Sequence, residues 1–241
     1  MRSTLGYQQC LTGAAAEAAA NLTRALELLG PHDYKIMAAS ALNYLGVAQR
    51  MLGDYDDAAA SQRRALQLYR EQGSRLGEAN ASLELGVAQR LAGDHDQAEQ
   101  SLDRALEIYR GIGDEVCEAE ALNALGDLRL ASSSPADALV CFQQAFAQTS
   151  EKTAPLEHVS ALDGIGRCHL QAGLPADAEA ALCEALALYR RLGLPRAAEI
   201  EDILGDLQHR LPKEAEMGQQ TLCGLDEFGR HRSSRSRIVR C

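Results

Sequence analysis

The sequence predicts an all-α protein built as a solenoid of stacked antiparallel helix pairs. Residues 81–110 repeat residues 41–70 with 17 of 30 positions identical, so the chain contains an internal repeat of 40 residues. Apolar residues follow helical spacing, and a repeat of this length is typical of helix pairs that bury their apolar faces against their neighbours. A Leu-Gly or Ile-Gly pair keeps the register, once shifted by one residue: Leu5-Gly6, Leu45-Gly46, Leu85-Gly86, Leu125-Gly126, Ile165-Gly166 and Leu204-Gly205.

Composition indicates that alanine and leucine form the core. The chain has 241 residues, of which 46% are hydrophobic but only 4% aromatic, and it has no Trp. Alanine allows two helix backbones to approach closely, so alanines in repeat register are expected where helices cross. They form two series: Ala18, Ala58, Ala98, Ala138 and Ala178, and Ala25, Ala65, Ala105, Ala145 and Ala185.

The repeats are expected over residues 1–30, 34–72, 75–112, 114–150 and 154–193, followed by a capping helix over 195–211. In the first unit, residues 1–12 match the second half of a helix, Gly13 matches a turn glycine, and residues 14–29 match a second helix. Either translation begins with a shortened helix, or the chain is the end of a longer array.

Turn and cap residues mark the helix ends. Asp33 is placed to cap the helix that follows the break at residues 30–32, and Gly53 ends that helix. The second helices of the four full repeats are expected at about residues 55–72, 95–111, 135–149 and 175–192. Residues 131–134 predict a looser turn in the third full repeat. Capping boxes are predicted where Asp54, Asp94 and Ser134 are followed three residues later by Asp57, Gln97 and Asp137.

The last part of the chain differs from the array. Residues 212–241 lack helical periodicity and have the composition of a disordered tail rich in Arg and Ser. All 34 acidic residues precede residue 230, and residues 230–241 contain five Arg, within a net charge of −10. An acidic array does not favour specific nucleic-acid binding, which requires basic residues at the phosphates. The sequence contains no long apolar run of the kind that spans a membrane.

The chemistry of an enzyme is not evident. The seven Cys form no CxxC pair and no Cys/His cluster with zinc spacing, so no metal site is predicted. Cys168 and His169 are adjacent on a helix and point about 100° apart, which prevents them from acting as a dyad. No glycine-rich phosphate loop occurs. We expect a non-enzymatic protein without a cofactor, and the odd number of Cys favours the reducing cytoplasm.

The helix pair resembles the tetratricopeptide repeat (TPR), through Leu45, Gly46, Ala58 and Ala65 and their equivalents 40 residues apart. The resemblance covers residues 1–211 and implies a right-handed superhelix. The period exceeds the usual length of about 34 residues, and Arg70, Arg110 and Arg190 stand where the family has a proline. Such long repeats are similar to those of kinesin light chains, Leu-Gly-Asn-type polarity adaptors and the C-terminal arms of bacterial STAND-type regulators. The Ala/Arg-rich, Lys-poor sequence is most similar to the bacterial set.

In this family the first helix of each pair forms the concave wall, so the resemblance implies a ligand groove there. Residues three before, one after and four after the central glycine share a helical face. Arg50 and Arg90 either clamp a carboxylate or form salt bridges with neighbouring repeats. With Asn80, one turn before Leu83, the candidate groove residues are Asn43, Val47, Arg50, Asn80, Leu83, Val87, Arg90, Asn123, Asp127, Asp163 and Arg167. The early repeats present an Asn/Val/Arg surface there, and the later repeats an acidic one.

These observations favour a scaffold that binds a protein or peptide partner. An acidic or carboxylate-bearing partner would suit the arginines of the groove. The resemblance implies a sensor or regulatory arm of a bacterial signalling or transcription-regulator system. The alternative is a structural module that associates with itself through an uncapped N-terminal helix.

Overall fold

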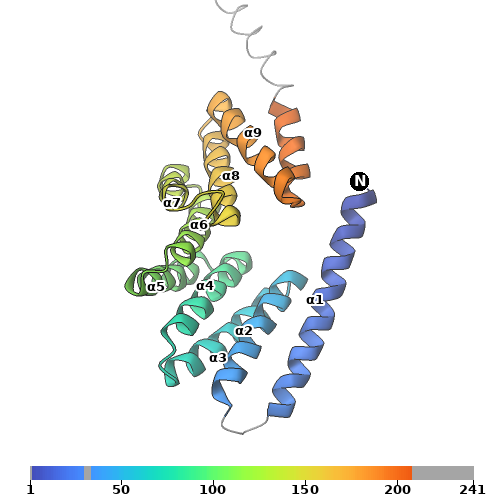
Figure 1. The fold of residues 1–241 in the computed structure, drawn as a ribbon, viewed down its shortest axis with the longest axis vertical. Helices are drawn as coiled ribbons and strands as arrows, with labels where there is room; N and C mark the ends of the chain where they lie inside the picture. Colours follow the sequence, from blue (N-terminus) through green and yellow to red (C-terminus); the bar gives the residue numbers. More distant parts are fainter. Residues whose placement is uncertain (1, 30–33, 208–241) are drawn as a thin grey trace, which may run out of the picture.

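The computed structural model describes residues 2–29 and 34–207, with side chains described from residue 13 onward. This part is helical, with no strand among its residues (Figure 1). The array ends in a helical segment at residues 196–207. The helices before it are α1 (Arg2–Leu29), α2 (Lys35–Leu52), α3 (Tyr55–Glu71), α4 (Arg75–Ala92), α5 (His95–Ile112), α6 (Glu115–Ala131), α7 (Pro135–Gln148), α8 (Pro155–Gln171) and α9 (Pro175–Leu192).

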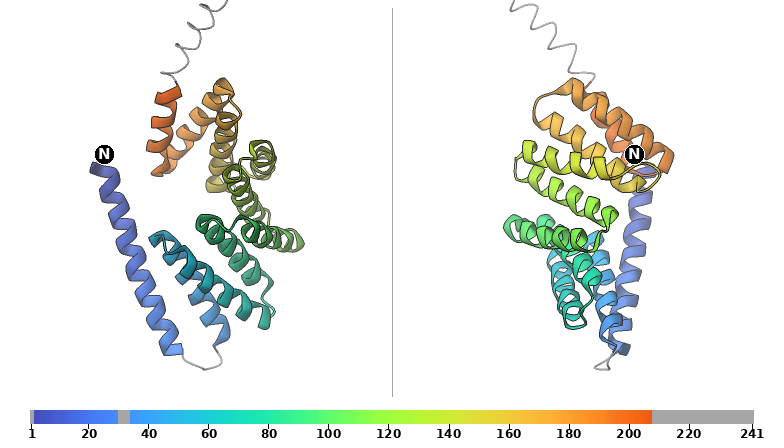
Figure 2. Two further views of the ribbon diagram at one scale, coloured as in Figure 1. Left: turned by 180° about the vertical axis from the view of Figure 1, so that it is seen from behind. Right: turned by 60° about the vertical axis from the view of Figure 1, so that its left-hand side comes forward.

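Helices α2 to α9 form four pairs that stack into a curved row, with α1 beside the first pair (Figures 1 and 2). We call the first helix of each pair helix A (α2, α4, α6 and α8) and the second helix B (α3, α5, α7 and α9). Each helix A contacts the helix A of the next pair, whereas no two B helices touch each other within residues 34–207. The A helices therefore lie on the inner, concave side of the curve.

The alanines and glycines of the repeat allow each pair to close tightly. All eight alanines of the two series in the four B helices are fully buried. A Cβ atom on Gly46, Gly86, Gly126 or Gly166 would meet the side chain of the same B-helix position, Gln62, Leu102, Phe142 or Leu182. The register deduced from the sequence is thus confirmed for the four full repeats.

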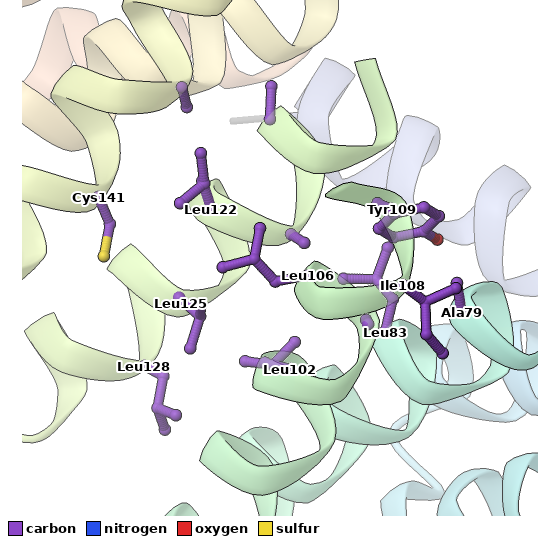
Figure 3. Close-up of a cluster of buried hydrophobic side chains, with 14 of the residues drawn as sticks. Ala79, Leu83, Leu102, Leu106, Ile108, Tyr109, Leu122, Leu125, Leu128 and Cys141 are labelled. Atoms are coloured by element: carbon purple, nitrogen blue, oxygen red, sulfur yellow. The ribbon is translucent and has the colours of Figure 1, made fainter. Parts of the chain in front are cut away.

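The largest part of the core lies between α4, α5 and α6 (Figure 3). Leu102, Ile108 and Tyr109 of α5 are at most 1% exposed, and they lie between Leu83 of α4 and Leu122 of α6. Burying a large apolar side chain contributes about 1.5–3 kcal/mol relative to leaving it exposed. The repeats consequently stabilise one another through these side chains.

The capping boxes predicted at the start of three B helices do not form. Asp54, Asp94 and Ser134 precede α3, α5 and α7, but none of their side chains caps the helix by a hydrogen bond. Asp54 and Asp94 have a ψ of 64°, whereas the residues that do cap, Ser74 and Asp114, have ψ values of 92° and 88°. A side-chain cap requires an extended backbone at that residue. Caps occur instead on two A helices, at Ser74 and Asp114.

The turn of the third full repeat is not looser than the others, contrary to the prediction. Ser133 has a φ of 60° and takes the left-handed conformation that Gly53 has in the first full repeat. Its N–H bonds to the Leu130 carbonyl at 3.1 Å, as that of Gly53 bonds to the Arg50 carbonyl. The same turn is therefore made without a glycine.

The turn expected at Gly13 is absent, and α1 runs through it as one helix from Arg2 to Leu29. The alanine-rich stretch over residues 14–20 favours continuation of the helix, and a Cβ on Gly13 would meet nothing within 4 Å. No close partner requires a turn there. The second half of α1 takes the place of a helix B, with Leu26 packed against the core between α2 and α3.

At the other end, Ile200 and Leu204 of the segment 196–207 are buried against α8 and α9, while Glu199 and Asp202 are exposed. This agrees with a polar capping helix as far as residue 207. The predicted cap at Asp33, the end of the capping helix and the tail over 212–241 lie outside the described residues. None of the helices described could cross a membrane. Of the cysteines with described side chains, Cys141 and Cys168 are buried, Cys117 is half-buried and Cys183 is exposed.

Candidate functional site

A pocket of about 630 Å³ lies on the concave side, across α4, α6 and α8. Its wall includes five of the residues predicted from sequence, all of them on A helices. It also includes Phe142, Tyr189 and Arg196 from other helices. The predicted groove residues in the pocket are Arg90, Asn123, Asp127, Asp163 and Arg167.

Two aspartates of the pocket are neutralised by arginines. Asp127 accepts a hydrogen bond from Nη2 of Arg167 at 2.7 Å. Asp163, which is 4% exposed, accepts bonds from Nε and Nη2 of Arg196 at 2.9 and 3.4 Å. Burial alone would lower the pKa of Arg196, but the bond to Asp163 outweighs it and the pKa is raised. The acidic surface expected in the later repeats is therefore balanced by basic side chains.

Arg90 is the third arginine of the pocket, and it belongs to none of the ion pairs found within residues 34–207. Its Nε is buried without a hydrogen-bond partner in this part of the chain. The lining contains three arginines and two aspartates, and Arg196 also pairs with Glu199, so Arg90 is the arginine of the lining without an ion-pair partner among the described residues. The Oδ1 of Asn123 and the Nε of Arg167 are also buried without a hydrogen bond among the described residues, although Nε of Arg167 lies 3.6 Å from Oδ1 of Asp163. A buried polar atom without a partner costs about 1–3 kcal/mol, so a ligand that satisfied these atoms would gain that energy.

The first repeats place their predicted residues differently. Arg50 donates from Nε to Oε2 of Glu84 at 3.1 Å, which is the salt bridge between neighbouring repeats given above as one alternative. Asn80 is turned toward helix B and accepts a bond from the Tyr109 hydroxyl. Leu83 is 4% exposed and belongs to the core. Arg50 and Arg90 therefore do not form a ladder of free cations.

The remaining predicted residues lie half-buried on the concave side. Val47 and Val87 occupy equivalent positions on α2 and α4, and Val87 also packs against the main core. Asn43 offers its backbone carbonyl to Nε2 of Gln62, while its own Oδ1 is buried without a partner among the described residues. None of these three residues lines the pocket.

A second electrostatic feature of the concave wall is acidic. Glu120 of α6 faces Glu84 of α4 and Glu157 of α8, and its pKa is raised to about 7 by burial in the hollow and then by these two carboxylates. The side chain keeps access to solvent, since its residue is exposed by surface area. The inner wall thus carries an acidic zone beside a basic pocket.

Sequence reasoning missed Arg196, Tyr189 and Phe142. Arg196 lies beyond the last full repeat, so repeat register could not assign it to the wall. Phe142 and Tyr189 are on B helices, and the Phe142 ring lies between Gly126 of α6 and Gly164 of α8; the guanidinium of Arg167 lies 5.5 Å from the centre of that ring. No signal in the sequence indicates these contacts. Among the residues with described side chains, no cluster of His, Cys, Asp or Glu could hold a metal ion.

The fold and its repeats can now be compared with known proteins. Models of the tetratricopeptide repeat match residues 37–111, 77–151 and 123–192, which together exceed half of the chain. The chain belongs to the tetratricopeptide repeat family. TPR repeats generally form non-catalytic scaffolds, and the helical stack described above is a TPR fold suited to protein interaction.

Solved structures show the same fold. BtubC (BKLC) from P. vanneervenii has a TM-score of 0.63 at 20% identity, over 75% of each chain. Two structures of a putative kinesin light chain from Podosopora anserina, with nearly identical TPR-like repeats, have TM-scores of 0.61 and 0.59 at 14% identity. They cover 80% and 79% of this chain and 93% of theirs. No curated protein matches the sequence.

Proposed function

We propose that this TPR array is a scaffold that holds an extended segment of a partner protein along its concave wall, with a partner carboxylate seated beside Arg90. The observation that carries the proposal is the guanidinium of Arg90, which lines the pocket without an ion-pair partner among the described residues and has its Nε buried without a hydrogen bond there. A carboxylate would supply an acceptor for the guanidinium, and charge-assisted bonds of this kind are about twice as strong as neutral ones. The amide of Asn123 offers a further polar contact to the backbone or side chain of the same segment.

Arg90 is a better candidate than Arg50 because the two arginines differ in their partners. Arg50 already has Glu84 as its ion-pair partner, so binding a second carboxylate would require that pair to break. Arg90 lines the pocket together with the Asp127–Arg167 pair. A partner that enters the pocket therefore meets Arg90 as a cation that no carboxylate of the described residues neutralises.

Selection of linear peptides from a random display library on the immobilised chain tests this proposal. We expect enrichment of peptides that share an Asp, a Glu or a free C-terminal carboxylate. The affinity of a selected peptide, measured by fluorescence anisotropy, should fall about 10- to 100-fold with Arg90→Gln, as expected when a charge-assisted bond is lost.

The matched control is Arg50→Gln, which removes an arginine from the same wall at the equivalent helical position. It should leave the peptide affinity nearly unchanged, because Arg50 is held by Glu84. Replacing the acidic residue of the peptide by its amide should lower the affinity for the wild-type chain as much as Arg90→Gln does. The same replacement should cause no further loss of affinity for the Arg90→Gln variant. Equal binding by Arg90→Gln and wild type would refute the proposal.

The resemblance to bacterial regulators extends the proposal to a cellular role. The array would act in the cytoplasm as the sensing arm of a signalling or transcription-regulator system, and partner binding would be its input. The Ala/Arg-rich, Lys-poor sequence supports this context. Mass spectrometry of the native gene product, isolated from a cytosolic fraction, would show whether an effector domain accompanies the array; a product found only outside the cytosol would contradict it.

A further inference from the structure

The first helix A has an apolar stripe on its surface. Met37 and Tyr44 of α2 are 59% and 63% exposed, and they lie seven residues apart on one face of the helix. Met51, again seven residues further, is 46% exposed and extends the stripe to the end of α2. We call Met37, Tyr44 and Met51 the α2 stripe.

In the later repeats, the positions of Met37 and Tyr44 are covered by the preceding repeat. Gly77, equivalent to Met37, lies so close to the ring of Tyr69 in α3 that a Cβ atom would collide with it. Gly164, equivalent to Tyr44, lies equally close to the ring of Phe142 in α7, so a Cβ atom there would also collide with a ring. The other equivalents, Cys117 and Glu157 for Met37 and Glu84 and Ala124 for Tyr44, are half-buried, whereas the large residues on α2 are exposed. The α2 stripe occupies the surface on which a preceding repeat would sit.

Helix α1 covers only part of that surface. Its second half packs beside α2 through Leu26 in the manner of a helix B. Because α1 continues as a single helix to Arg2, no helix A of a preceding pair rests against α2 in the described structure. The exposed stripe is continuous with the established contact between α1 and α2.

The two ends of the described array differ in polarity. At the far end, the segment 196–207 exposes Glu199, Glu201, Asp202 and Asp206, as expected for a terminal helix that faces water. Helix α2 contains no acidic residue. Its two cations, Lys35 and Arg50, are paired with Glu71 and Glu84 of other helices. Helix α2 is therefore electrically neutral and carries an apolar stripe, in a chain with a net charge of −10.

We propose that the α2 stripe is the contact surface for a second copy of this chain. Two acidic copies repel each other over most of their surface, and α2 is the helix A at which they can approach without bringing carboxylates together. The stripe is also symmetrical, since Met37 and Met51 stand equally far from Tyr44. A two-fold axis at Tyr44 places Tyr44 of one copy against Tyr44 of the other, and Met37 against Met51. Such a self-complementary contact is the usual form of a homodimer interface.

Sedimentation equilibrium of the full chain over a range of concentrations tests this proposal. The wild-type mass should rise toward that of a dimer, whereas Tyr44→Glu and Tyr44→Lys should each remain monomeric because a like charge would face itself across the axis. Mixing the two variants should restore a dimer, since Glu and Lys then meet. Val140→Glu is the control: Val140 is 51% exposed on α7, away from the stripe, and its replacement should leave the dimer intact.

Several outcomes would overturn the proposal. A wild-type chain that stays monomeric at all concentrations would show that another occupant, such as residues 2–12 or a different protein, covers the stripe. A dimer that survives Tyr44→Glu would place the contact elsewhere, and a mixture of the two variants that stays monomeric would exclude the two-fold axis at Tyr44. Met37→Gln with Met51→Gln provides a second, uncharged disruption if a charged variant loses its circular dichroism spectrum.

Discussion

Arg50 of α2 and Glu84 of α4 form an ion pair, 3.1 Å from Nε to Oε2, that joins two consecutive repeats across the concave wall. Both side chains are partly shielded from solvent, at 27% and 20% exposure. Of two arginines in equivalent positions, Arg50 is therefore held by a carboxylate of the neighbouring repeat. The other, Arg90, has no such partner in α6 within the described chain.

The Arg50–Glu84 pair is expected to contribute little to stability. A double-mutant cycle of Arg50→Ala and Glu84→Ala, measured by urea unfolding, should give a coupling energy of about 0.2–1 kcal/mol, the range for ion pairs near the surface. A coupling well above this range would mean that the contact between A helices depends on the pair.

Phe142 is held between glycines of two A helices, and this predicts a difference between equivalent glycines. A Cβ on Gly126 would come within 2.6 Å of the Phe142 ring, and Gly164 blocks the ring from the opposite helix. At Gly46 the nearest atom is the end of the flexible Gln62 side chain. Both Gly→Ala changes gain the same helix propensity, so Gly126→Ala should be more destabilising than Gly46→Ala by about 1–2 kcal/mol. Equal midpoints in thermal unfolding would contradict the assigned packing.

The repeat register was predictable because it depends on residues that recur. Leu-Gly in helix A and the two alanines in helix B meet at the same crossing in every repeat, so sequence spacing alone locates the core. Ala98 and Ala105, for example, are both fully buried, as expected. Because the same pattern occurs in four repeats, a departure in one repeat does not hide it, and the four full helix pairs could be located from the sequence.

Features that occur once could not be predicted in this way. Gly13 matches a turn position, but whether a turn forms depends on a partner helix that the sequence does not show. The charge balance of the pocket depends on Arg196, which has no equivalent in other repeats. Asp54 and Asp94 do not cap although Asp114, the same residue type, does; their backbone ψ of 64° differs from the 88° of Asp114, and residue type alone does not reveal that difference.

Ser133 predicts a stabilising substitution. A residue with a side chain in the left-handed region costs about 1–2 kcal/mol relative to glycine, and Ser133 has a φ of 60°. Ser133→Gly should therefore raise the free energy of unfolding by about 1 kcal/mol. Ser132→Gly is the control, because Ser132 has a φ of −84°, where glycine relieves no strain and should destabilise instead. If both changes destabilise, the strain at Ser133 is absent in solution.

The raised pKa of Glu120 predicts how stability depends on pH. In the folded chain this pKa is about 7, above its ordinary value of 4.5, because of burial and the carboxylates of Glu84 and Glu157; Asp114 acts in the same direction and Arg50 opposes it. Between pH 4.5 and 7 the folded state therefore keeps a proton that the unfolded state loses. The contribution of Glu120 to stability falls as pH rises through this window and does not recover above it.

Glu120→Gln tests this sign because the amide remains neutral at every pH. The variant should match wild type in melting temperature near pH 4.5, where Glu120 is protonated in the folded chain, and should exceed it above pH 7, where the wild-type carboxylate faces Glu84 and Glu157. Glu184→Gln, at an exposed position on α9, controls for the loss of one negative charge from an acidic chain. The difference in melting temperature between Glu120→Gln and wild type could instead stay constant from pH 4.5 to pH 8, or match that of the Glu184→Gln control. Either result would show that Glu120 ionises normally and that the three carboxylates do not act on one another across the concave wall.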